Sequence, residues 1–237
     1  MSELTFQLAI FMQTLGGEAD RIRRSLPYPA PFGVACPVPL PTYRPPTAMP
    51  SARHGPAFLY VLRMSGAEDL LKAGLTADPL ARWSSFHPRW FEAFDIEHSL
   101  LVETESRSDA QALETALHRR LKAHACPVPL TMRAFAGGAT EWFRGASLAA
   151  QDFVRSCEAQ GFVVHADARG LIGASLHTQR HVLATVLDQA VRNARDGVLT
   201  PQEVDAVRDL AEAHGAFGGD LSALVTDEGR ALLHLGS

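Results

Sequence analysis

Two short apolar runs, separated by a glycine-containing loop, constrain the fold of this chain more than any other feature. Residues 57–63 read Ala-Phe-Leu-Tyr-Val-Leu-Arg, residues 70–75 read Leu-Leu-Lys-Ala-Gly-Leu, and Gly66 lies between them. Runs of this length that are rich in aromatic and branched apolar residues are typical of strands. Because the connection is short, we expect the two strands to pair as a hairpin.

Helix and strand signals alternate after this expected hairpin. Asp78-Pro79 supplies an N-cap residue and a first-turn proline, which predict a helix that ends at His87-Pro88. The further elements that we expect are a strand over 94–103, a helix over 108–124, a short strand or turn over 140–143 and a helix over 146–159. The order ββαβα with a covering helix predicts a small mixed α+β domain and not a doubly wound fold.

The chain divides into three parts by composition. Residues 1–56 hold an expected N-terminal helix and a proline-rich arm, because proline fixes the backbone in extended forms and removes hydrogen-bond donors. Residues 57–160 hold the mixed domain, and residues 161–237 predict an all-α C-terminal module. The helices that we expect in this module span about 176–195, 201–215 and 220–233.

Charge limits how the chain can bind nucleic acid. Its 237 residues include 22 basic and 26 acidic side chains, which give a net charge of −4. This balance excludes a wholly basic surface, so any contact with nucleic acid uses a local patch. Residues 146–237 carry 7 basic and 12 acidic side chains, so this region is a poor duplex binder. We therefore expect residues 170–237 to bind a protein partner or a second copy of the chain.

Cysteine content and hydropathy indicate a cytoplasmic protein. Cys36, Cys126 and Cys157 are too few and too scattered for a disulfide framework, and they form no CxxC zinc pair. The first residues lack the basic run of a signal peptide, and no run of about 18 apolar residues predicts a membrane span. We therefore expect a reducing compartment and no membrane partner.

A carboxylate and an imidazole lie four residues apart in the helix expected over 108–124. Glu114 and His118 share one face of this helix, about 100° from the leucine stripe that we expect to be buried. A carboxylate that faces a cleft can hold Mg²⁺ and leave coordination positions open for a substrate phosphate. The alternative is a solvated Glu–His pair on the helix surface.

Taken singly, three further polar residues have ordinary structural explanations. Tyr60 lies in the middle of a strand, where a tyrosine is commonly a core residue with its hydroxyl hydrogen-bonded. Lys72 lies between apolar neighbours, where a lysine is commonly at a sheet edge or extends its ammonium to water. Arg82 lies one turn into a helix, where an arginine is commonly a surface charge.

Taken together, these residues resemble the motifs of the GIY-YIG nuclease superfamily. Five segments follow one another in that family's order: Phe-Leu-Tyr (58–60), Lys-Ala-Gly (72–74), Arg82, Glu-Thr-Ala-Leu-His (114–118) and Glu-Trp-Phe (141–143). The lysine that begins the second motif, followed by Thr76, is most similar to the phage-type branch. The resemblance spans about residues 57–150 and rests on the order of the motifs.

The resemblance implies a DNA endonuclease that hydrolyses phosphodiester bonds with one divalent ion, Mg²⁺ or Mn²⁺. It implies that Glu114 holds the metal, that Tyr60 activates or positions the attacking water, and that Arg82 steadies the scissile phosphate. Lys72 stands where the family has a second tyrosine, and as an ammonium it would stabilise charge. His118, from its place beside Glu114, would transfer a proton or lie next to the metal.

The remaining expectations concern substrate, partners and alternative functions. Arg82, Lys72, Thr76 and Trp142 are expected to contact single- or double-stranded DNA. Glu141 and Trp142 are expected to support the site or pack its edge, and the alternative for Glu141 is a direct metal role. One alternative is a catalytically silent relative that binds nucleic acid or a protein. Another is an interaction protein of phage or mobile-element biology whose function lies in its helical tail.

Overall fold

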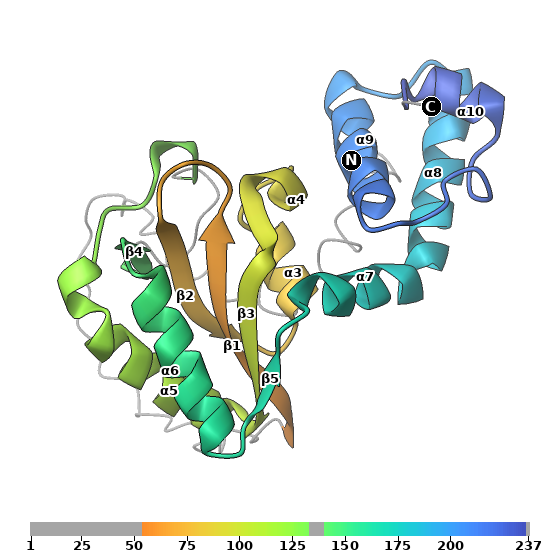
Figure 1. Cartoon of the computed structure of the whole chain (residues 1–237). Helices are drawn as coiled ribbons and strands as arrows, with labels where there is room; N and C mark the ends of the chain where they lie inside the picture. The colour runs from red at the N-terminus through yellow and green to blue at the C-terminus, as the bar shows by residue number, and fades with distance from the viewer. Residues whose placement is uncertain (1–53, 133–139, 236–237) are drawn as a thin grey trace, which may run out of the picture.

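The computed structural model of the chain describes residues 54–132 and 140–235 (Figure 1). The expected N-terminal helix and proline-rich arm lie outside these described residues, apart from the last few positions of the arm. Residues 54–64 form the first strand of a five-stranded sheet, which begins within the segment that we assigned to that arm.

The described strands form one antiparallel sheet in the order β4-β2-β1-β3-β5. The strands are β1 (His54–Met64), β2 (Leu70–Thr76), β3 (Phe94–Ser106), β4 (Trp142–Arg144) and β5 (Val163–His165). The expected hairpin is present, and it pairs Tyr60 with Gly74 and Leu62 with Lys72. The predicted α+β fold with a helical C-terminal part is therefore confirmed. Strand β5 was not among the strands that we expected.

The described helices follow the expected order with shifted ends. They are α3 (Pro79–Ser84), α4 (Trp90–Ala93), α5 (Arg107–Arg120), α6 (Ser147–Ala159), α7 (Ala168–Thr178), α8 (Arg180–Arg195), α9 (Pro201–Ala216) and α10 (Asp227–Leu232), with 3₁₀ turns η1 (Lys122–His124) and η2 (Leu130–Met132). In the described ranges, no helix has both the length and the apolar character needed to cross a membrane.

The prediction of a single helix over about 176–195 is wrong at the start of this range. The structure has two helices there, α7 and α8, which are separated at Gln179. Helix α7 begins earlier than predicted because Asp167 caps it, accepting a hydrogen bond from the backbone N–H of Gly170 at 2.7 Å. The last expected helix, over 220–233, is shorter in the structure and begins after the N-cap residue Thr226.

Alternation along the strands gives the sheet two apolar faces, each covered by helices (Figure 1). On β1, Leu59 and Val61 face α5 and α6, whereas Tyr60 and Leu62 face α3 and α4. The first face contains Leu117 of α5, as the leucine stripe predicted. Both sides of β1 are therefore buried, and a polar side chain in the middle of β1 lies inside a hydrophobic core.

The C-terminal helices extend the second of these cores and build a third. Ala168, Ile172 and Leu176 of α7 pack in the same cluster as Tyr60, while α8, α9 and the residues that flank α10 form a separate core. Helix α9 is tied to the start of α4 through Arg89, whose guanidinium lies 2.9 Å from Asp209. The domain boundary that we expect at residue 160 stays a prediction.

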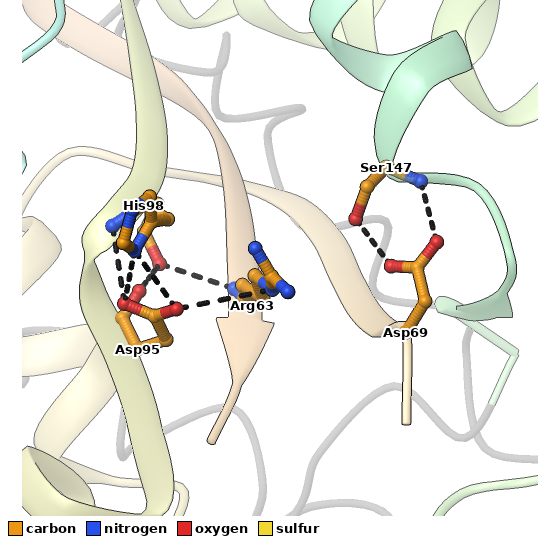
Figure 2. A network of polar contacts seen from close by, with 6 residues as sticks. Arg63, Asp69, Asp95, His98 and Ser147 are labelled. Carbon is orange, nitrogen blue, oxygen red and sulfur yellow. Dashed lines mark hydrogen bonds and ion pairs between the residues drawn. The ribbon is translucent and has the colours of Figure 1, made fainter. Parts of the chain in front are cut away.

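Two aspartates fix the loop end of the sheet (Figure 2). The Asp69 carboxylate accepts hydrogen bonds from the backbone N–H of Ser147, at 3.1 Å, and from its hydroxyl, so the residue just before β2 holds the start of α6. Asp95 of β3 lies 2.9 Å from the His98 ring and 3.8 Å from Arg63 of β1. These contacts join β2 to α6 and β1 to β3 at the loop end.

Gly74 allows the aromatic ring of Tyr60 to lie against β2. A Cβ atom at this position would stand 2.4 Å from the Tyr60 hydroxyl oxygen and 2.7 Å from Cζ. The ring cannot move away easily, because it is fully buried and lies beside the rings of Trp83 and Phe86. The glycine is therefore required by close approach and not by a turn.

We expect Gly74→Ala to destabilise the protein by about 1–3 kcal/mol, because it overpacks a filled core. Gly215→Ala in helix α9 is the matched control. Apart from its own helix backbone, no atom lies within 4 Å of where a Cβ would stand on Gly215, so alanine should be neutral or stabilising by up to about 1 kcal/mol. Urea denaturation of the full chain measures both. Equal stability of wild type and Gly74→Ala would contradict the close packing of Tyr60 on β2.

Candidate functional site

Tyr60 places a hydroxyl inside the core between the sheet and α3. The side chain is fully buried, and its hydroxyl oxygen has no partner among the described residues in good hydrogen-bond geometry. Burial raises the pKa of the phenol above its usual range, and the nearby positive charge of Arg82 acts in the opposite direction. A buried hydroxyl that is poorly satisfied costs free energy, so its presence here calls for a reason other than stability.

Lys72 places an ammonium in the same region. It lies on the same face of the sheet as Tyr60, it is fully buried, and its Nζ donates a hydrogen bond to Glu141 at 2.9 Å. The Nζ also lies 4.9 Å from the centre of the Phe86 ring and 5.1 Å from that of Trp142. The pKa of Lys72 is lowered, because burial disfavours the charged form more than the neighbouring Glu141 favours it. The ion pair and the two rings thus hold a cation where water is excluded.

Arg82 brings a second cation to the Phe86 ring. Its guanidinium carbon lies 4.8 Å from the ring centre, and its side chain is partly exposed. The Glu141 side chain is also partly exposed, at 24%. The polar cluster of Tyr60, Lys72, Arg82 and Glu141 therefore reaches the surface through Arg82 and Glu141. Sequence reasoning missed Phe86, since it reads as an ordinary apolar residue at a helix end.

Glu114 and His118 lie on α5, which packs on the opposite face of the sheet. The Glu114 carboxylate accepts a hydrogen bond from Gln111 at 2.6 Å, and His118 Nε2 lies 3.2 Å from the carbonyl oxygen of Ala73. The pKa of Glu114 is raised, mainly by burial. His118 acts against this shift, and the charge of Glu141 adds to it. The charge of Glu114 also acts on Tyr60 and Lys72. The predicted metal ligand is thus coupled electrostatically to the cluster on the other face.

Thr76 and Trp142 have structural contacts that account for their positions. The Thr76 hydroxyl donates to the carbonyl oxygen of Asp78 at 2.9 Å and accepts from its N–H at 3.0 Å, which holds the turn between β2 and α3. Trp142 is fully buried and packs on Lys72. Both residues support the cluster, and both side chains are buried in this structure. Their expected contact with DNA stays a prediction.

The acidic residues fit an open metal site and do not fit a closed one. Within the ranges that the structure describes, no three His, Cys, Asp or Glu side chains gather to hold a metal. Glu114 offers one half-buried carboxylate, with the second carboxylate of Glu141 near enough to affect its pKa. Proteins often hold Mg²⁺ with one or two carboxylates, and water and substrate phosphates complete the shell. Such a site matches the groups present here.

Comparison with known families bears on the region that holds these residues. Residues 57–158 match the family model described as the T5orf172 domain. The predicted membership of the GIY-YIG superfamily is corrected by this match, because the matching family is a different one, although it has been linked to a GIY-YIG-like fold. No curated protein and no solved structure matches the chain. The region from β1 to α6 is similar to the T5orf172 domain. Domains of this family are associated with nuclease and DNA-binding functions.

Proposed function

We propose that this chain is an endonuclease that hydrolyses phosphodiester bonds in DNA with a divalent metal ion. The observation that carries the proposal is the gathering of two cations, Lys72 and Arg82, beside the buried hydroxyl of Tyr60. Cations held in place before the substrate arrives suit a phosphate whose charge grows in the transition state. The similarity of residues 57–158 to the T5orf172 domain supports DNA as the substrate.

Each residue of the cluster has a role that its environment permits. Arg82, the more exposed cation, would bind the oxygens of the scissile phosphate, and Lys72 would stabilise the charge that develops on them. A phenol is protonated near neutral pH and burial raises the pKa of Tyr60 further, so its hydroxyl would orient water without deprotonating it.

The carboxylate of Glu114 would hold the metal ion, Mg²⁺ or Mn²⁺. When bound, such an ion activates water and neutralises phosphate charge. His118 lies one turn further along α5 and would accept or deliver a proton there. The charge of Glu114 acts on both Tyr60 and Lys72, so the metal ion and the two cations would serve the same substrate phosphate.

A second function is favoured by the burial of the same groups. Neither Tyr60 nor Lys72 has any exposed surface in this structure. If a substrate does not reach this cluster, the chain is a catalytically silent module that binds nucleic acid or a protein. We also propose that residues 170–237, which are rich in acidic side chains, bind a protein partner or a second copy of the chain.

Replacing Glu114 by glutamine tests the metal assignment. Glutamine keeps the size of the side chain and removes its charge, so we expect Mg²⁺- or Mn²⁺-dependent nicking of supercoiled plasmid to fall by at least about 100-fold. The stability of the chain to urea should be unchanged, because Glu114 is only half-buried. Glu158→Gln, an exposed glutamate of α6, is the control and should cleave at the wild-type rate.

Two results of this experiment point elsewhere. Full-rate cleavage by Glu114→Gln would remove Glu114 from the metal site. No cleavage by a well-folded wild-type chain with either ion would favour the silent binding module over the nuclease.

Replacing Tyr60 by phenylalanine separates function from packing. The hydroxyl has no well-oriented hydrogen-bond partner among the described residues, so its removal should leave stability unchanged or raise it by about 1 kcal/mol. If the hydroxyl orients water, cleavage should nevertheless fall by about 100-fold or more. Thermal unfolding and plasmid nicking of the same preparation give both numbers. A less stable variant that cleaves normally would show that the hydroxyl serves the core alone.

A further inference from the structure

Three exposed cations lie close together where α5 ends and η1 begins. Arg119 and Arg120 form the last turn of α5, and Lys122 opens η1. All three side chains are exposed, and none forms a hydrogen bond or an ion pair with a residue of the described ranges. These positive charges are therefore available to a partner.

Several exposed arginines elsewhere in the described chain are neutralised by acidic neighbours. Arg144 lies 3.2 Å from Glu68, and Arg195 lies 2.8 Å from Glu228. The three cations at the end of α5 differ, because they have no such partner in the part of the chain that the structure describes. In a chain with a net charge of −4, they form the kind of local patch that binding to a polyanion requires.

The position of this patch relates it to the candidate metal ligand. Glu114 and Lys122 are eight residues apart, and Arg119 is five residues from Glu114, so at about 1.5 Å per residue the cations lie roughly 8–12 Å further along the helix axis. One DNA strand advances about 3.4 Å along its axis per nucleotide. At 100° per residue, Arg119 lies about 140° around the helix from Glu114 and Arg120 about 120° in the other direction, so a strand bound near Glu114 would reach these cations by passing around the C-terminal end of α5.

We propose that Arg119, Arg120 and Lys122 form a surface that binds the DNA backbone at the C-terminal end of α5. This inference rests on the proposed function, since it takes DNA as the substrate. Contacts of this kind position the nucleic acid and do not read its sequence. The surface thus supplies affinity, while the cluster around Lys72 and Glu114 supplies the chemistry.

The test is binding of the full-length chain to a fluorescently labelled DNA duplex in EDTA, followed by anisotropy at several salt concentrations. Arg119→Gln/Arg120→Gln/Lys122→Gln should weaken binding by at least about 10-fold near 0.1 M salt and reduce the slope of log K against log salt by about 2 to 3. Arg119→Lys/Arg120→Lys keeps the charge and should keep the slope. Arg195→Gln removes a paired cation of α8 and should also keep it.

Several outcomes would overturn the proposal. They are an unchanged slope in the triple glutamine variant, a loss of slope equal to that of Arg195→Gln, and no binding of DNA by the wild type. Cations at the end of a helix also interact favourably with its dipole, so a variant that loses stability but keeps the salt slope would reduce the patch to that role. EDTA prevents metal-dependent cleavage, so this assay measures binding alone. If the wild type binds DNA here but does not cleave it once Mg²⁺ or Mn²⁺ is supplied, the proposed nuclease is contradicted and this surface is not.

Discussion

The ion pair between Lys72 and Glu141 is the interaction on which the candidate site depends. The Lys72 ammonium is fully buried between the rings of Phe86 and Trp142, and Glu141 is the described carboxylate that contacts it. Removing one partner of a buried pair costs about 3–5 kcal/mol, whereas replacing both by apolar residues is often neutral or stabilising. A stable core therefore does not require a lysine at this position. A site that holds a cation ready for a phosphate does require one.

The sheet connects this pair to the other polar groups. Because alternate residues of a strand face opposite sides, β2 presents Lys72 to the aromatic cluster and Ala73 to α5, where His118 contacts the Ala73 carbonyl. Gly74, the next residue, makes room for the Tyr60 ring. The Lys-Ala-Gly segment of β2 thus touches both parts of the candidate site, one on each face of the sheet, and a change in its register would separate them.

The sequence predicted the architecture well where periodicity was strong and poorly where contacts were long-range. The hairpin, α5 with its leucine stripe and α9 with its N-terminal proline all follow from local patterns. The family assignment was wrong, because it rested on short motifs made of common residue types. The aromatic cage around Lys72 could not be read from the sequence, because Phe86 and Trp142 come from separate segments that only the folded sheet and α3 bring together. The separation of Glu114 from Tyr60 by the sheet was invisible for the same reason.

The measurement that tests the account most directly is DNA cleavage by the double variant Lys72→Met/Glu141→Gln, compared with wild type at equal Mg²⁺ or Mn²⁺ concentration. Methionine fills the space of the lysine stem and glutamine that of the glutamate, so we predict a folded protein with an equal or higher melting temperature. We also predict that its metal-dependent cleavage falls to background while the wild type cleaves. Cleavage at the wild-type rate by the folded double variant would contradict the claim that this buried cation serves phosphodiester hydrolysis.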